Sequence, residues 1–321
     1  MPDVYGNFTC SSFFSGGGFL DYAFKDFFSI IWANEMCEPA AESYAANIGS
    51  HIRVGDITQI PMYEIPGTDL IIGGPPCQEY SSSGTNKGEK GDRGKLVWTY
   101  LRVIKEKKPM AFLFENVVGL ARKHKTTLTR LIAQFEKMGY TISWKIVNSS
   151  RFGTPQHRER VIIVGIRNDL GFAFKFPDEA AEERTVRMAI SDLPTADGTF
   201  PNHYSTWSSP TPERIYDVIA NPRNQFRGMR RLPWDGISPT LTAHIAKDGR
   251  EFLHPHEDRR LTVRECLRIM SVPDSYVFPE SVPLSHQYRA IGNGVEFNMG
   301  RALAIALKQQ LCEVPTQICL F

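Results

Sequence analysis

The stretch that decides the fold reads Asp69-Leu70-Ile71-Ile72-Gly73-Gly74-Pro75-Pro76-Cys77-Gln78. A short apolar run that ends in glycines is typical of a buried strand in a parallel α/β sheet. The glycines allow a sharp turn, and the prolines then stiffen the chain that leads to Cys77. Because open α/β sheets bind ligands just beyond the carboxyl ends of their strands, Cys77 is a candidate nucleophile. A structural cysteine in a proline-rich turn is the alternative.

A second apolar run, Phe112–Val117, predicts another strand, and this strand ends in a carboxylate, Glu115. Two strands that each deliver one reactive group to the same edge of a sheet suggest a nucleophile and its acid partner. Cys77 and Glu115 are therefore predicted to share one site.

The first half of the chain alternates between strand patterns and helix patterns. The predicted strands are residues 8–14, 29–34, 52–54, 69–72 and 111–114, and the predicted helices begin near 19 and cover 39–47 and 95–107. This βαβ rhythm predicts a doubly wound, mostly parallel sheet. Residues 145–147 and 161–164 flank a loop and predict a late, antiparallel pair of strands.

The composition changes after about Lys175. Prolines, serines and aromatic residues crowd the segment 194–239, which has little helical or alternating periodicity. Such a segment predicts a smaller, irregular domain. Helix patterns return at 262–270 and 296–310.

Bulk properties exclude several classes of protein. The chain has 321 residues, of which 42% are hydrophobic, as in an ordinary soluble protein. No signal peptide is visible, and no apolar run approaches the ~20 residues that span a bilayer. Six cysteines without CxxC spacing indicate free thiols, so we expect a reducing cytoplasm and no membrane association. His254 and His256 lack further ligands at a zinc-like spacing, so no metal site is expected.

The net charge is only +2, but arginines gather in two short stretches. They are Arg223, Arg227, Arg230 and Arg231 in the first, and Arg259, Arg260, Arg264 and Arg268 in the second. A locally basic face fits contact with phosphates, although runs of charge more often form a solvated surface.

Six motifs follow one another along the whole chain: Phe14–Gly18, Pro75–Gln78, Glu115–Val117, Gln156–Arg160, Arg260–Glu265 and Tyr288–Val295. In this order they resemble the motifs of the DNA (cytosine-5) methyltransferases of bacterial restriction-modification type. The resemblance implies a Rossmann-like, S-adenosylmethionine-dependent methyltransferase fold. It also implies a catalytic and cofactor-binding domain at 1–175, a target-recognition domain at 176–282, and a C-terminal segment, 283–321, that returns to the catalytic domain.

The resemblance implies S-adenosylmethionine as the cofactor. The implied contacts are the backbone of Phe14, Gly16 and Gly18, the ribose ligand Glu35, the adenine ligand Asp56, and Asn293 and Val295 on the methionine side. At Phe19 the chain departs from the family, which usually has a further glycine. From the residues alone, the glycine cluster and Glu35 describe a nicotinamide dehydrogenase equally well, and Glu35 and Asp56 could instead cap the helices that follow them.

The resemblance also assigns catalytic roles. A Cys77 thiolate would add to carbon 6 of cytosine and so activate carbon 5 for methylation. Glu115 would donate a proton at N3 and Arg160 would stabilise charge at O2, while Arg158 would steady the catalytic loop or the nucleophile. An alternating surface strand is the other interpretation of Arg158–Arg160. Because a stacked base cannot reach a buried thiol, the target cytosine must flip out of the duplex.

Double-stranded DNA is the implied substrate. The glycine-rich, charged segment 84–94 predicts either a plain flexible loop or a lid that closes on DNA. The expected DNA contacts are Gln78, Ser81, Lys87, Arg93, Arg223, Arg227, Arg230, Arg231 and Thr240. We expect a monomer, with a cognate restriction endonuclease as a candidate partner.

Three alternatives stay open. A tRNA cytosine-5 methyltransferase would share the Pro-Pro-Cys and Glu-Asn-Val motifs, although the Cys-Phe-Thr signature of that subgroup is absent. A non-enzymatic relative that only binds DNA would be expected to lose Cys77 or Glu115, and both are present. A nicotinamide dehydrogenase would leave Cys77, Glu115 and the arginine pair unexplained.

Overall fold

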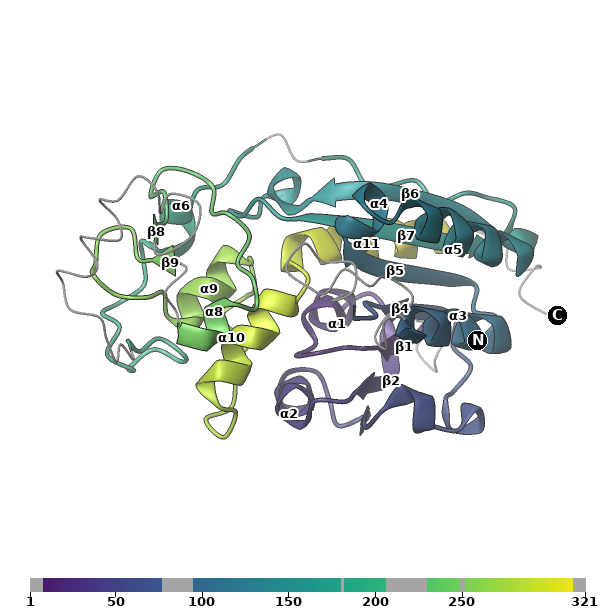
Figure 1. Ribbon diagram of the computed structural model, residues 1–321, viewed down its shortest axis with the longest axis horizontal. Helices are drawn as coiled ribbons and strands as arrows, with labels where there is room; N and C mark the ends of the chain where they lie inside the picture. The colour runs from purple at the N-terminus through teal and green to yellow at the C-terminus, as the bar shows by residue number, and fades with distance from the viewer. Residues whose placement is uncertain (1–7, 77–94, 180–181, 206–229, 249–251, 314–321) are drawn as a thin grey trace.

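The computed structural model describes residues 8–76, 95–179, 182–205, 230–248 and 252–313. A seven-stranded sheet with the order β3-β2-β1-β4-β5-β7-β6 forms the larger part of the molecule (Figure 1). Its strands are β1 (Thr9–Phe13), β2 (Ser29–Glu35), β3 (Ile52–Val54), β4 (Leu70–Gly73), β5 (Ala111–Val117), β6 (Tyr140–Asn148) and β7 (Glu159–Arg167). The first five strands pair in parallel, whereas β7 pairs antiparallel with β5 and β6. The predicted doubly wound, mostly parallel sheet is therefore confirmed, together with its antiparallel end.

Alternating side chains along the strands build a core on each face of the sheet. On β5, Ala111 and Leu113 pack with α1 and α11, whereas Phe112 and Phe114 pack with α3 and α5. The helices around the sheet are α1 (Phe19–Phe24), α2 (Glu38–Asn47), α3 (Lys95–Lys107), α4 (Gly119–Arg122), α5 (Lys125–Lys137) and α11 (Phe297–Cys312). The central strands β4, β5 and β7 are buried on both faces and are largely apolar, which is why their sequence signal is strong.

The rest of the described chain forms a smaller lobe with few regular elements (Figure 1). These elements are α6 (Val186–Ile190), β8 (Arg230–Arg231), α8 (Ile245–Asp248), β9 (Phe252–Leu253), α9 (Val263–Ile269) and α10 (Leu284–Asn293). Phe19 and Tyr22 of α1 belong to the core of this lobe, so the lobe is packed against the first helix of the sheet domain. In the ranges that the structure describes, no helix is both long and apolar enough to cross a membrane.

One expected boundary is wrong. The strand that carries Glu115 does not end there, because β7 pairs with β5 as far as Val117, opposite Arg160. Glu115 therefore lies inside β5, opposite Ile162. Hydrogen bonding to a neighbouring strand sets this boundary, and the sequence of β5 alone cannot reveal it.

Two described helices of ten residues or more, α5 and α10, are not among those expected from the sequence. In α5 the buried residues Leu128, Leu131 and Phe135 follow a helical spacing, so this helix was open to prediction. The start of α10 lacks a capping signal, because Pro283 at its N-cap makes no side-chain capping bond. A glycine inside α10, Gly292, weakens the helical pattern further.

The second arginine stretch is structural, contrary to the expectation that it contacts phosphates. The guanidinium of Arg259 makes two hydrogen bonds with Glu265, at 2.9 and 2.7 Å. The Arg264 side chain is fully buried, and that of Arg268 binds Asp274. Arg260 lies over the ring of Tyr288, 3.9 Å from its centre. These arginine contacts stabilise the irregular lobe, in which few helices and strands supply backbone hydrogen bonds.

Candidate active site

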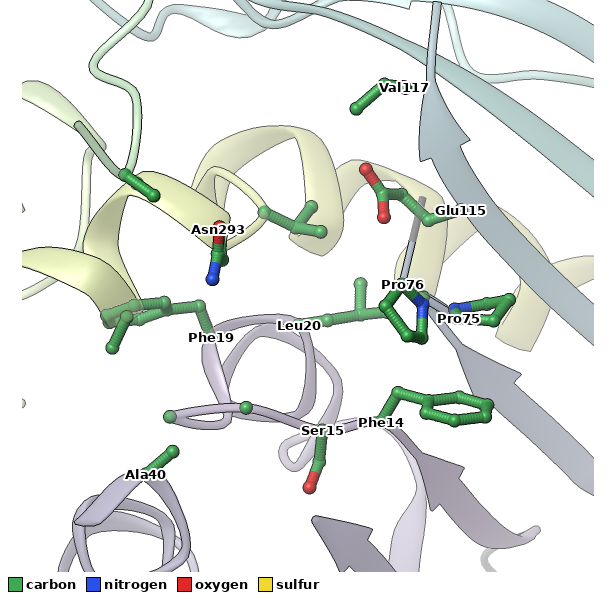
Figure 2. A pocket seen from close by; sticks show the side chains of 18 of the residues that line it. Phe14, Ser15, Phe19, Leu20, Ala40, Pro75, Pro76, Glu115, Val117 and Asn293 are labelled. Carbon is green, nitrogen blue, oxygen red and sulfur yellow. The ribbon is translucent and has the colours of Figure 1, made fainter. Parts of the chain in front are cut away.

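A cavity of about 1550 Å³ lies at the carboxyl ends of the parallel strands. Its walls come from the segments that follow β1 to β5 and, opposite them, from residues within 240–246 and 286–295. Figure 2 shows Glu115 and Asn293 projecting into this space from β5 and α10, with Pro75 and Pro76 between Glu115 and Phe14. Motifs that are far apart in the sequence thus meet around one space.

The loop after β1 has an unusual backbone. Phe14, Gly16 and Gly18 have φ angles of 56°, 58° and 81°. A positive φ is rare for a bulky residue such as Phe14, and strain of this kind is concentrated at functional sites. Phe14 and Gly16 line the cavity as expected. Gly18 instead starts α1 and packs against α2, where a Cβ atom would lie 2.3 Å from Ile48.

Two carboxylates line the cavity beside this loop. Glu35 Oε2 accepts from the Gly16 amide at 2.9 Å, and its Oε1 accepts from Met36 and Cys37 amides at 2.9 and 2.8 Å. Because an ionised carboxylate offers about four acceptor sites, Glu35 retains capacity for a ligand hydroxyl. Asp56 is exposed, and its Oδ1 accepts from the Thr58 amide at 2.9 Å. Asp56 therefore does cap a short 3₁₀ helix, and it lines the cavity as well.

On the opposite wall the chain places the two other expected cofactor residues. Asn293, at the end of α10, is exposed to the cavity, whereas Val295 is buried and contributes an apolar surface. One wall of the cavity is thus acidic and the other is partly apolar.

The proline turn lies directly against Glu115. A Cβ atom on Gly74 would sit 2.8 Å from Glu115 Oε2, so only glycine permits this approach. Asn116 Nδ2 donates to the Pro75 carbonyl at 3.3 Å, and so supports the turn. Beyond Pro76, the expected site residues Cys77, Gln78, Ser81, Lys87 and Arg93 lie outside the described residues.

Glu115 and Arg160 form a nearly buried ion pair. Arg160 Nε lies 2.7 Å from Glu115 Oε1, and the side chains are 10% and 11% exposed. Burial raises the pKa of Glu115, and the charges of Arg160 and Arg158 reverse this only in part. A carboxyl group that holds its proton to higher pH than an ordinary glutamate is suited to proton donation.

Arg158 also lines the cavity, but its side chain has no exposed surface. Its two terminal nitrogens donate to the carbonyls of Leu241 at 2.7 Å and of Gly292 and Gly294, each at 2.8 Å. Its Nε lies 3.1 Å from Glu296 Oε1. Arg158 therefore positions the backbone of the wall opposite Glu115, and the alternating-surface interpretation of Arg158–Arg160 is wrong.

The first arginine stretch and Thr240 have different surroundings. Thr240 Oγ1 donates to the His157 carbonyl at 2.7 Å, on the wall of the cavity. Arg230 is exposed, whereas the Arg231 guanidinium binds the Glu257 carbonyl at 2.8 Å and the Asp258 carboxylate. Arg223 and Arg227 lie outside the described residues. Of the two described arginines, Arg230 is the better placed to reach a partner.

Asp21 is a buried carboxylate at the back of the cavity. Its Oδ1 accepts from the Tyr44 hydroxyl at 3.1 Å, and no arginine or lysine of the described chain forms an ion pair with it. Burial outweighs the effects of Ser12 and Tyr44 and raises the pKa of Asp21 from 3.8 to about 6. The charged form of Asp21 thus destabilises the ligand-free protein.

Asp21→Asn is expected to stabilise the ligand-free protein at pH 8. Since the folded-state pKa lies above the unfolded one, the contribution of Asp21 to stability is full below about pH 4 and is lost as pH rises through 6. The shift corresponds to about 3 kcal/mol in the free energy of unfolding. Urea unfolding at pH 4 and pH 8 measures the difference. A variant less stable than wild type at both pH values would contradict this assignment.

The structural roles of three residues in this region were not predicted from the sequence. Glu296 directly follows Val295 and is the buried acid that pairs with Arg158. Because a buried arginine requires an acidic partner, a search for that partner could have identified Glu296. Phe19 stood out only as a departure from the glycine pattern. Tyr276, whose hydroxyl donates to the Gly17 carbonyl at 2.7 Å, carried no signal, because 259 residues separate the two positions.

The chain is similar to known proteins along nearly its whole length. The model of the C-5 cytosine-specific DNA methylases matches residues 8–309. M.MthTI, a type II methyltransferase of Methanothermobacter thermautotrophicus, is 34% identical over an alignment that covers 95% of this chain and 98% of the relative. M.FnuDI, a type II methyltransferase of Fusobacterium nucleatum, is 34% identical with 94% of each chain covered. The structure of the Entamoeba histolytica methyltransferase EhMeth shares the fold, with a TM-score of 0.75, 18% identity, and coverage of 95% of this chain and 99% of that one. Because the family model spans nearly the whole chain and every motif around the cavity, the chain belongs to the family of C-5 cytosine-specific DNA methylases.

Proposed function

We propose that this enzyme methylates one short target sequence in double-stranded DNA, and that it acts on a flipped-out cytosine through a covalent adduct with Cys77. S-adenosylmethionine supplies the electrophilic methyl group when it is bound. The observation that carries the proposal is the buried Glu115–Arg160 pair at 2.7 Å, in the cavity that the proline turn also lines.

In the proposed reaction the Cys77 thiolate adds to carbon 6 of the cytosine. The electron pair of the 5,6 double bond then becomes available at carbon 5, and negative charge develops on the ring. The Glu115 carboxyl donates its proton at N3, and the Arg160 cation stabilises the charge at O2. After methyl transfer a base removes the proton from carbon 5, and the C–S bond breaks to release Cys77.

The cavity fits S-adenosylmethionine better than a dinucleotide. Glu35 and Asp56 offer acceptors for the hydroxyls and amine of an adenosine, while Phe14 and Val295 offer apolar surface. A pyrophosphate would need the free amides of the glycine loop, and the Gly16 amide is already bound by the negative carboxylate of Glu35. This arrangement disfavours the nicotinamide dehydrogenase interpretation.

DNA binding is assigned to the lobe across the cavity, within the proposed recognition domain 176–282. Its candidate contacts are the exposed Arg230 and the half-buried Thr240. The segments with Arg223, Arg227 and the proposed lid 84–94 are further candidates. Since the named relatives are type II methyltransferases, we propose that the protein protects DNA from a cognate restriction endonuclease. The proposed active unit is a monomer, because one chain supplies every residue named for the site.

The test is bisulfite sequencing of DNA and tRNA from cells that lack cytosine-5 methylation and express the protein. We expect resistant cytosines at one short DNA sequence, and none in cells that express Cys77→Ser. Resistant cytosines found only in tRNA would mean that the substrate of the enzyme is tRNA and not DNA. The absence of resistant cytosines in both nucleic acids would contradict the proposed function.

A further inference from the structure

The two backbone loops of the cofactor cavity are held by different parts of the chain. The first is the glycine loop, Phe14–Gly18, and the second, called the second loop below, is the C-terminal end of α10 with the residue that follows it, Gly292–Gly294. Arg158 donates hydrogen bonds to the carbonyls of Gly292 and Gly294 and so holds the second loop in place. A pair of aromatic residues, Phe19 and Tyr276, contacts both loops.

Tyr276 reaches the glycine loop from the small lobe. It is fully buried, and its hydroxyl donates to the Gly17 carbonyl at 2.7 Å. A Cβ atom on Gly17 would lie 3.1 Å from the same hydroxyl oxygen, so the loop and the tyrosine are in close contact. The backbone of the neighbouring Val277 is anchored to Asn47 of α2 by two hydrogen bonds of 2.9 Å, which hold the segment in place.

Phe19 connects this contact to the second loop. Its ring lies 4.9 Å from the ring of Tyr276, measured between centres, and is only 2% exposed. A Cβ atom on Gly294 would lie 2.3 Å from Phe19 Cδ2, so the ring packs directly on the second loop. In Figure 2 Phe19 lies between the start of α1 and α10, on the same side of the cavity as Asn293.

We propose that Phe19 and Tyr276 form a clasp that sets the spacing of the two loops, which makes Tyr276 a positioning residue for S-adenosylmethionine. The inference rests on the proposed function, because it concerns the same cofactor. A glycine at position 19 could not fill the space over Gly294. The clasp explains how this chain keeps the cavity in shape with a phenylalanine there. It also places one determinant of cofactor affinity in the region proposed to recognise DNA.

The experiment compares Tyr276→Phe with Tyr22→Phe in calorimetric titrations of S-adenosylmethionine and S-adenosylhomocysteine. Tyr22 is a matched control, since its ring lies 5.4 Å from Tyr276 and its hydroxyl binds Ser275 Oγ at 2.8 Å, away from both loops. We expect Tyr276→Phe to weaken both ligands about five-fold to ten-fold. Tyr22→Phe should stay within about two-fold of wild type, although it also loses one partly buried hydrogen bond. Phe19→Leu, which keeps an apolar side chain but loses the ring, should also weaken binding.

Thermal unfolding of the ligand-free variants separates positioning from general stability. We expect similar midpoints for the two tyrosine variants, with a difference in ligand affinity only for Tyr276→Phe. Equal affinities for Tyr276→Phe and wild type would overturn the clasp, and so would equal losses in both tyrosine variants. If wild type itself failed to bind S-adenosylmethionine, the proposed function would fail as well, which is a distinct result.

Discussion

Glu115→Gln is expected to reduce the rate of methyl transfer by about 100-fold or more. Glutamine keeps the size of the side chain and can still accept from Arg160, but it has no proton to give to N3. Because burial raises the pKa of Glu115, the wild-type rate should fall as pH rises through that pKa, and the variant should lose this dependence. Single-turnover methylation with saturating DNA, measured across pH, gives both quantities.

The matched control for this change is Glu179→Gln. Glu179 is also paired with a cation, Lys145 at 3.0 Å, but the pair is exposed and remote from the cavity. Its loss should leave the rate within about two-fold of wild type, because exposed ion pairs contribute little. A Glu115→Gln enzyme with a near wild-type rate would remove Glu115 from the chemistry.

Arg158→Met is expected to lower the free energy of unfolding by about 3–5 kcal/mol. The change leaves the fully buried Glu296 without its cation and the carbonyls of Leu241, Gly292 and Gly294 without their donor. Because Gly292–Gly294, at the C-terminal end of α10, lines the cofactor cavity, the affinity for S-adenosylmethionine should fall as well. Urea unfolding measures the first effect and calorimetric titration the second.

The double variant Arg158→Met/Glu296→Leu tests the origin of this loss. It removes both buried charges, so its destabilisation should be much smaller than the sum of the two single changes. Additive losses would mean that the pair is not coupled. They would assign the effect of Arg158 to its carbonyl contacts alone.

The central strands of the sheet were predictable from the sequence because they are buried on both faces. Apolar runs that end in glycine or in polar residues marked β2, β4 and β5, and the structure confirms each of them. The end of β5 was not predictable, because pairing with β7 carries the strand past Glu115 to Val117. Local pattern identifies an element, whereas its neighbours in the fold decide where it stops.

Most of the described residues that were expected at the site line one cavity, but only some of their contacts could be predicted. The motifs identified Glu115 and Arg160, yet their 2.7 Å pairing depends on two strands that the sequence does not place in register. The clustering of charged residues in the sequence was the least reliable guide to where their side chains lie. Thr262 and Glu265 are readable as a capping box, and the structure has it, but nothing local reveals that Glu265 also binds Arg259. Arginines that form a basic cluster in the sequence are therefore divided between the protein interior and its surface.

The central claim, a covalent adduct between Cys77 and a cytosine, is tested most directly by trapping. DNA that carries 5-fluorocytosine at the target position cannot lose a proton from carbon 5, so the adduct should persist once the methyl group has been transferred. With S-adenosylmethionine present, wild type is predicted to form a complex with this DNA that survives denaturing electrophoresis, and Cys77→Ser is predicted to form none. A wild-type enzyme that methylates its normal target but is never trapped on the fluorinated one would contradict the account.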